Sequence, residues 1–332
     1  MARTVNAAFD EFMSETVNLD SKKTTKARNS RDELLKQIKS FSSDPTFPKL
    51  QNINPIHFGS FNRRTKIRPL DDIDLMVALS AQGAPHSQNG GIIKITIDND
   101  SNLGPYCHDR TNQLSSIKIV NKFVKKLSKI HQYQQAQIKR NQEAATLKLK
   151  SYEWNFDIVP FFTTRPYKNG RDYYLIPNGK GHWKITDPRI DKTRVERINQ
   201  LHNGYVLQVI RAIKYWNKHA RMPTINSYLL ENMILNYYEK QKYLANQYVD
   251  VEIIKVLEFI QQGVYQEVND PKSIQGNLNT LDIEEKSKIS KKAREDRILA
   301  VTARQYEYYK KDYESSIKKW GEIFGNEFPS FS

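Results

Sequence analysis

The sequence predicts an α+β fold, with a mixed β-sheet and its helices first and an all-helical part after it. Two segments, 72–79 and 154–162, alternate apolar and polar residues, as half-buried strands do. From about Thr193 onward, apolar residues recur at helical spacing instead. We therefore expect two domains, residues 1–200 containing the sheet and residues 201–332 built only of helices.

Composition narrows the class of protein. The chain has 332 residues, of which 38% are hydrophobic and 11% aromatic, enough for a sizeable core. We see no apolar run long enough to span a membrane and no leader-like segment near residue 1, so we expect a cytoplasmic protein with no membrane partner. The single cysteine, Cys107, excludes an internal disulfide and a cysteine-rich zinc module.

The net charge of +15 favours polyanionic partners. Nucleic acid and nucleoside triphosphates are both candidates. Because 27% of the residues are charged and lysine is spread widely, solubility explains the charge equally well. Charge alone therefore does not choose the partner.

The first sixty residues are expected to hold helices and a turn. Apolar spacing predicts helices around 9–13 and 34–41, separated by the Lys/Thr-rich stretch 21–30. Three prolines in 43–55 end any helix there. The segment 57–61 is expected to be a short turn.

The rest of the chain supplies the remaining elements. Between the two alternating strands we expect a flexible loop at 81–91 and a strand at 92–97. An amphipathic helix at 115–130 and a further strand at 145–150 are expected to follow. Beyond them we expect three helices, at 202–219, 227–239 and 251–262. A loop at 263–283 and one long helix, or two, at 283–324 are expected to complete the chain.

Three aspartates are the candidate catalytic residues. Asp72 and Asp74 occupy alternate strand positions and so project from one face, where their charges repel. Burying such a pair is costly unless a cation neutralises it, and Mg²⁺ prefers oxygen ligands. Asp157, on the polar face of the second strand, completes a metal site if the two strands pair. By alternation Asp71 points to the other face or precedes the strand.

Gly59 and Ser60 are candidate phosphate-binding residues. Glycine lets the backbone approach a phosphate closely, and the serine offers a hydroxyl and an N–H. A helix beginning after them would add its positive end. A lone Asp-x-Asp is usually a solvated surface pair, but the ordered set of Gly-Ser, Asp-x-Asp and a distant Asp is more specific.

The run GSFNRRTKIRPLDDIDLMVAL, beginning at Gly59, resembles the signature of polymerase-β-like nucleotidyltransferases. More narrowly, it is similar to the cGAS/DncV-like nucleotidyltransferases (CD-NTases) of the bacterial anti-phage system CBASS. The resemblance covers most of residues 50–332, and its further segments are 156–162, 174–188, 209–235 and 318–329.

This resemblance implies a bilobal fold, with a sheet lobe packed against a helical lobe. It also implies synthesis of a cyclic or linear oligonucleotide second messenger from nucleoside triphosphates. Asp72, Asp74 and Asp157 would hold two Mg²⁺ ions, with Mn²⁺ as a substitute. Gly59 and Ser60 would hold the donor triphosphate.

Lys214 and Ser227 match family positions that contact the triphosphate from the helical lobe. A lysine ammonium acts as a point charge against phosphate oxygens. The alternative for Lys214 is an exposed helix lysine. The alternative for Ser227 is a helix N-cap, with Glu231 just past the capping-box position.

The implied partners are nucleoside triphosphates, a nucleic-acid or protein activator, and a downstream effector reached through the product. The lysines of one helix could form a nucleic-acid surface or simply a solvated face: Lys122, Lys125, Lys126 and Lys129. Trp183 could stack on a base or belong to the core.

Two other functions compete with messenger synthesis. An RNA-tailing or CCA-adding enzyme would use the same aspartates with a polymer acceptor. A catalytically silent nucleic-acid-binding sensor is the other, and the three aspartates argue against it. The sequence leaves base choice, linkage and ring size open.

Overall fold

The structure is a computed structural model that describes residues 2–98, 100–167 and 170–332. It confirms the α+β class. Its contacts divide the chain into two compact units, here called the sheet unit (21–62 and 69–189) and the helical unit (1–20, 63–68 and 190–332). Each is described by itself. The division into domains 1–200 and 201–332 stays a prediction.

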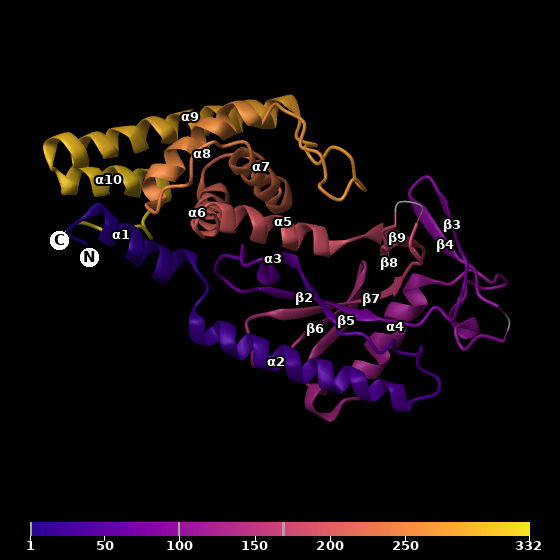
Figure 1. The fold of residues 1–332 in the computed structure, drawn as a ribbon. Coiled ribbons are helices and arrows are strands. Elements are labelled where there is room, and N and C mark those ends of the chain that lie inside the picture. Colours follow the sequence, from indigo (N-terminus) through magenta and orange to yellow (C-terminus); the bar gives the residue numbers. More distant parts are fainter. Residues whose placement is uncertain (1, 99, 168–169) are drawn as a thin grey trace. The chain divides into compact units, whose positions relative to one another are not determined.

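The sheet unit is built on one mixed sheet (Figure 1). Its strand order is β1-β2-β7-β8-β9-β4-β3, and β6 pairs with both β7 and β5. Strands β2 and β7 pair in parallel, whereas the other pairs are antiparallel. The strands are β1 Ile56–Phe58, β2 Asp72–Ala78, β3 His86–Asn89, β4 Ile92–Ile95, β5 Gln137–Asn141, β6 Ala144–Lys148, β7 Asn155–Thr163, β8 Tyr174–Pro177 and β9 Trp183–Thr186.

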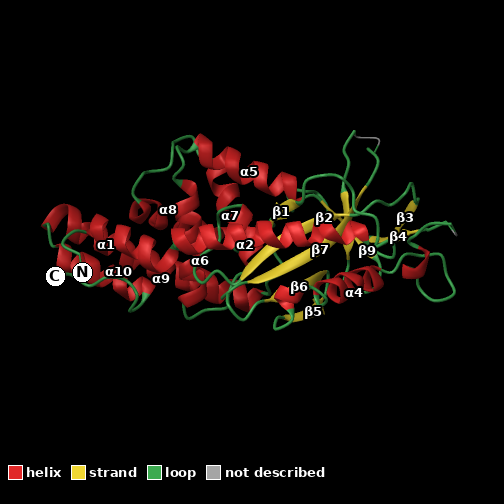
Figure 2. Cartoon of the chain, turned by 90° about the horizontal axis from the view of Figure 1, so that it is seen from below, coloured by secondary structure: helices red, strands yellow, loops and turns green. Residues whose placement is uncertain are grey.

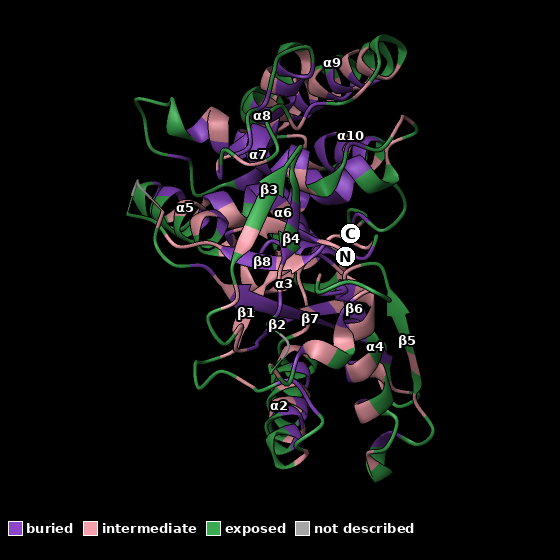
Figure 3. Ribbon diagram, turned by 90° about the vertical axis from the view of Figure 1, so that its right-hand side faces the viewer, coloured by how far each residue is buried: buried purple, intermediate pink, exposed green. Residues whose placement is uncertain are grey.

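Alternation along the strands separates two faces of this sheet. Ile73 and Leu75 of β2 are buried on one face. Helix α4 (Ser116–Leu127) buries Phe123 and Leu127 and packs against β5 to β8. Figures 1 and 3 show α4 and the longer α2 on the same side of the sheet, and Figure 3 shows the buried residues along β2 and β7.

The opposite face carries the candidate aspartates at one end and an apolar cluster at the other. The cluster lies further along β2 and β7 and contains Met76, Ala78, Ala144, Val159, Phe161 and Tyr174. The polar end of this face is therefore bounded by core, and its side chains are held by neighbouring strands rather than by loops alone.

The helical unit has helices and no strand among its described residues, as expected for the second part of the chain (Figure 2). Its helices are α1 Val5–Glu11, α5 Pro188–Leu201, α6 Val206–His219, α7 Ser227–Glu239, α8 Val249–Gly263, α9 Ile283–Gln305 and α10 Tyr313–Phe324. Aromatic packing ties the first helix to the last, since the Phe9 ring meets that of Trp320 at 4.9 Å.

Several expected elements differ in the structure. The Lys/Thr-rich stretch 21–30 does not separate helices but lies inside α2 (Ser21–Lys39). The expected loop 81–91 contains β3. The last helix is two, because a π-helical turn, Tyr306–Lys310, and a left-handed Lys311 end α9. Across the described ranges, no helix is both long and apolar enough to cross a membrane.

Candidate active site

The parallel pair β2–β7 brings the three candidate aspartates together on one sheet face. The register places Asp74 opposite Asp157 and Asp72 opposite Asn155. Neighbouring strands lie about 4.8 Å apart, so the backbones of all four residues are close. Asp71 precedes β2. The strand pairing on which the sequence argument depended is therefore present.

Asp74 lies against the Gly-Ser segment. Gly59 has a φ of +72°, and a Cβ built on it would stand 1.7 Å from Asp74 Oδ2. No side chain larger than hydrogen fits there unless the carboxylate moves. Gly59 is therefore required both by its backbone conformation and by the position of Asp74.

Asp157 is held by a hydrogen bond from β6, the strand that pairs with β7 on the side away from β2. Thr146 of β6 donates its hydroxyl to Asp157 Oδ1 at 2.5 Å. Asp74 thus lies against Gly59, which follows β1, and Asp157 is bonded to β6, the strand on the other side of the β2–β7 pair. Neither the bond from Thr146 nor the Gly59 contact was predicted from the sequence.

The donor set at this end of the sheet fits a hard divalent cation. All four side chains offer oxygen, which is the ligand type that Mg²⁺ takes. The Asn155 carboxamide oxygen is buried and has no hydrogen-bond partner in the structure. No three His, Cys, Asp or Glu side chains within residues 2–98, 100–167 and 170–332 are already grouped as a metal site. The register therefore puts the three aspartates on one sheet face, without a ready-made cluster of three such ligands among the described residues.

Gly59 and Ser60 begin a helix rather than form a turn. The segment expected as a turn at 57–61 is the end of β1 followed by α3 (Gly59–Asn62). Helix α3 therefore includes both residues, instead of starting after them. Four residues give a weak helix dipole, so any phosphate contact would depend on the individual N–H and hydroxyl groups.

Lys214 of α6 is not an exposed helix lysine. Its side chain is 7% exposed, and its Nζ lies 3.7 Å from Glu231 Oε2 on α7. Arg63 Nε and Thr65 Oγ1 donate to the same carboxylate at 2.6 and 2.7 Å. Burial lowers the pKa of Lys214. Burial alone would raise the pKa of Glu231, but Arg63 and Lys214 outweigh it and hold that pKa below its usual value.

Ser227 is the first residue of α7 and not its N-cap. The cap is Asn226, whose side chain accepts from the N–H groups of Tyr228 and Leu229 at 2.9 and 3.4 Å. Ser227 itself is exposed. Glu231 makes no capping box, since its carboxylate is committed to Arg63 and Thr65.

Burial and ion pairing bear on two other interpretations of the sequence. Trp183 is fully buried and donates its indole N–H to Leu114 O at 3.0 Å, so it is a core residue. Lys126 pairs with Asp44 at 3.0 Å and Lys122 lies 3.9 Å from the same carboxylate. The lysine face is thus partly neutralised, and Lys129 lies beyond the end of α4.

The predicted site residues therefore form two sets in the structure. The sheet unit holds Asp72, Asp74, Asp157, Gly59 and Ser60, and the helical unit holds Lys214 and Ser227.

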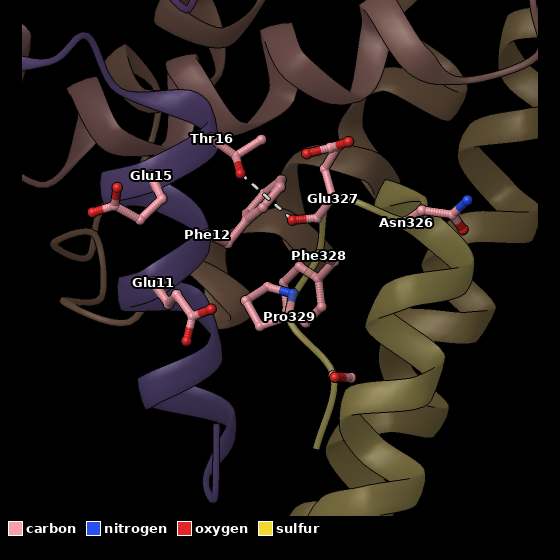
Figure 4. Close-up of a pocket in the computed structure, with 9 residues that line it drawn as sticks. Glu11, Phe12, Glu15, Thr16, Asn326, Glu327, Phe328 and Pro329 are labelled. Atoms are coloured by element: carbon pink, nitrogen blue, oxygen red, sulfur yellow. Dashed lines mark hydrogen bonds between the residues drawn. The ribbon is translucent and has the colours of Figure 1, made fainter. Parts of the chain in front are cut away.

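A cavity of about 300 Å³ in the helical unit belongs to neither set. As Figure 4 shows, it lies between the first helical segment and the C-terminal tail, and it is lined by Glu11, Phe12, Glu15, Thr16 and 326–330.

Comparisons with known proteins agree with this geometry. No protein-family model matches the chain. A probable cyclic nucleotide synthase of Bacillus cereus (strain VD146) is 42% identical over 335 residues, covering 99% of each chain.

Solved structures show the same fold. E. coli MS115-1 CdnC with ATP aligns with a TM-score of 0.70 at 16% identity, covering 97% of this chain and 98% of that one. The complex of that CdnC with HORMA-deltaN aligns at 0.66, with the same identity and coverage. Vibrio cholerae DncV, a cyclic AMP-GMP synthase, aligns at 0.57 with 14% identity, covering 83% of this chain and 70% of that one.

The fold, the three aspartates on paired strands and the full-length relative point the same way. At 42% identity over nearly its whole length, this chain belongs to the cGAS/DncV-like nucleotidyltransferases, the family of cyclic nucleotide synthases, and is an enzyme.

Proposed function

We propose that this enzyme condenses nucleoside triphosphates into a cyclic oligonucleotide of two or three units, or a linear one, as a second messenger in anti-phage signalling. The observation that carries the proposal is the β2–β7 register, which sets Asp74 beside Asp157 and Asp72 beside Asn155. Three carboxylates and one carboxamide on one face suit the binding of divalent cations, which would neutralise the phosphate charge.

The reaction is an in-line displacement. A 2′- or 3′-hydroxyl of one nucleotide attacks the α-phosphate of another, a new phosphodiester bond forms, and the bond to pyrophosphate breaks. A second round, using the other end of the linear intermediate, closes the ring. Bound Mg²⁺ or Mn²⁺ would supply charge neutralisation at the triphosphate and lower the pKa of the attacking hydroxyl.

The proposed roles in metal binding and triphosphate binding fall to different residues of the chain. Asp72, Asp74 and Asp157 would hold the cations, and Asp157 would also help activate the acceptor hydroxyl. Gly59 and Ser60 offer backbone and hydroxyl donors to the donor triphosphate. We propose the same target for Lys214 and Ser227, because a buried ammonium and an exposed hydroxyl at a helix start both suit phosphate oxygens.

Nucleoside triphosphates are the proposed substrates, and an effector that binds the product is the proposed downstream partner. The structure of CdnC in complex with HORMA-deltaN supports a protein partner for this chain as well. Adding such a partner should raise turnover without changing the product. An identical rate with and without it would count against that regulation.

The proposal is tested by incubating the protein with all four nucleoside triphosphates and Mg²⁺, without RNA, and analysing the products by mass spectrometry. Messenger synthesis predicts pyrophosphate release and a small oligonucleotide, which resists phosphatase when it is cyclic. Product formation only when an RNA acceptor is added would instead identify a tailing enzyme. The absence of any transfer under both conditions would indicate a silent sensor.

A further inference from the structure

Thr146 lies on β6 and faces the same side of the sheet as Asp157, whereas its chain neighbours Ala145 and Leu147 are fully buried on the opposite face. Thr146 itself is 8% exposed. The antiparallel register of β6 with β7 places it directly opposite Asp157. Directly opposed residues on one face have Cβ atoms about 5 Å apart, so the two side chains are necessarily neighbours.

The hydrogen bond between Thr146 and Asp157 is short and involves one of the two carboxylate oxygens. Thr146 Oγ1 donates to Asp157 Oδ1 at 2.5 Å, a length typical of a hydroxyl donating to a charged carboxylate. A β-branched side chain on a strand has few χ1 rotamers, so the donor is itself well fixed. The contact therefore sets the orientation of the carboxylate and engages one of its two oxygens.

We infer that Thr146 is a positioning residue for nucleotidyl transfer, acting through Asp157. It holds Oδ1, so that Oδ2 is the oxygen presented to a cation or to the acceptor hydroxyl. The inference rests on the proposed function, in which Asp157 touches the reacting groups. A misplacement of a reacting group by about 1 Å costs about 100-fold in rate, so a fixed carboxylate matters for catalysis.

The competing explanation is that Thr146 merely satisfies a buried hydroxyl. Thr163 provides the matched control, because it is also a strand threonine of this sheet, at the far end of β7. Its hydroxyl is buried and has no hydrogen-bond partner in the structure. Removing that hydroxyl changes the same chemical group without touching Asp157.

The experiment compares Thr146→Val, Thr146→Ser, Thr163→Val and Asp157→Asn in the full-length protein. Turnover number and KM for nucleoside triphosphate are measured, together with Mn²⁺ binding by calorimetry without nucleotide. Thr146→Val should lower kcat by about 10- to 100-fold and weaken Mn²⁺ binding by about tenfold, as for other residues that orient ligands, with KM little changed. Thr146→Ser should restore both, and Thr163→Val should match the wild type.

Two outcomes separate the possible failures. Wild-type kcat and Mn²⁺ affinity in Thr146→Val, with Asp157→Asn inactive, would overturn the role of Thr146 and leave the proposed function standing. An active Asp157→Asn would overturn the proposed function itself. If Thr146→Val does not fold, Thr146→Ala replaces it under the same criteria, because it also removes the hydroxyl that donates to Asp157.

Discussion

At the scale of single residues, the contact between Gly59 and Asp74 makes the sharpest prediction. Gly59→Ala places a methyl group where Asp74 Oδ2 now lies, 1.7 Å from the new Cβ. The carboxylate must move, and we expect nucleotide transfer to fall by about 100-fold or more. Initial rates of pyrophosphate release would measure this.

Gly90→Ala is the control for backbone strain. Gly90 also has a positive φ, +54°, but a Cβ there would meet nothing within 4 Å. This variant should lose some stability, about 1 kcal/mol, and keep full activity. Equal activity losses in the two variants would show that strain, and not the carboxylate of Asp74, explains the effect at Gly59.

The sequence predicts which residues belong to the site only where strand alternation decides which face a side chain occupies. Alternation distinguished Asp72 from Asp71 and gave Asp157 a site-facing position. Thr146 and Asn155 could have been found by pairing the strands in register, but no local signal gives that register. Glu231 looked like a misplaced capping residue, because its partners Arg63 and Thr65 lie more than 160 positions away in the sequence.

At the scale of elements, the sequence suggested two roles for Ser227, helix capping and phosphate contact. In the structure Asn226 caps α7, so only the proposed phosphate contact remains for Ser227. Asn226→Ala removes the side chain that caps α7 and should lower the free energy of unfolding by about 1 kcal/mol. Ser227→Ala should leave stability unchanged but raise the KM for nucleoside triphosphate. Urea unfolding and steady-state kinetics on both variants check this.

The reverse pattern would contradict the assignment. If Ser227→Ala destabilised the protein while KM stayed constant, Ser227 would be structural. Loss of stability in Asn226→Ala together with an unchanged KM would agree with a purely capping role for Asn226.

Elements with strong periodicity were predictable, and short polar ones were not. Helix α7 begins and ends where the sequence indicated, because its apolar face is continuous. Strand β5 has the sequence QIKRN and is mostly exposed, so it lacks the alternation that marks a half-buried strand. Its pairing with β6, and not its own composition, makes it a strand.

At the scale of the whole molecule, Glu231 of α7 links its own helix and the preceding α6 to the segment 63–68, which lies more than 160 positions earlier in the sequence. Its buried carboxylate meets Arg63 and Thr65 of the segment 63–68, and Lys214 of α6. Glu231→Gln would leave two buried cations poorly compensated and should destabilise the protein by about 3–5 kcal/mol. Glu284→Gln, which breaks an exposed ion pair with Lys288, should change stability little.

The same carboxylate predicts the sign of a pH dependence. Its pKa in the folded protein lies below the ordinary value of 4.5. The stability it contributes is therefore fully present above pH 4.5 and is lost as the pH falls through the lower, folded-state pKa. The difference in unfolding free energy between wild type and Glu231→Gln should shrink on acidification below that pH. A difference independent of pH would contradict a charged Glu231.

The most direct test of the central claim compares Asp72→Asn with Asp71→Asn. The two carboxylates are adjacent in sequence, but only Asp72 belongs to β2, where strand alternation puts it on the same face as Asp74. With Mg²⁺ and nucleoside triphosphates, Asp72→Asn should lose transfer by about 1,000-fold or more, because several kcal/mol of charge stabilisation disappear. Asp71→Asn should keep wild-type product formation by mass spectrometry. Full activity in Asp72→Asn would contradict the assignment of the catalytic aspartates.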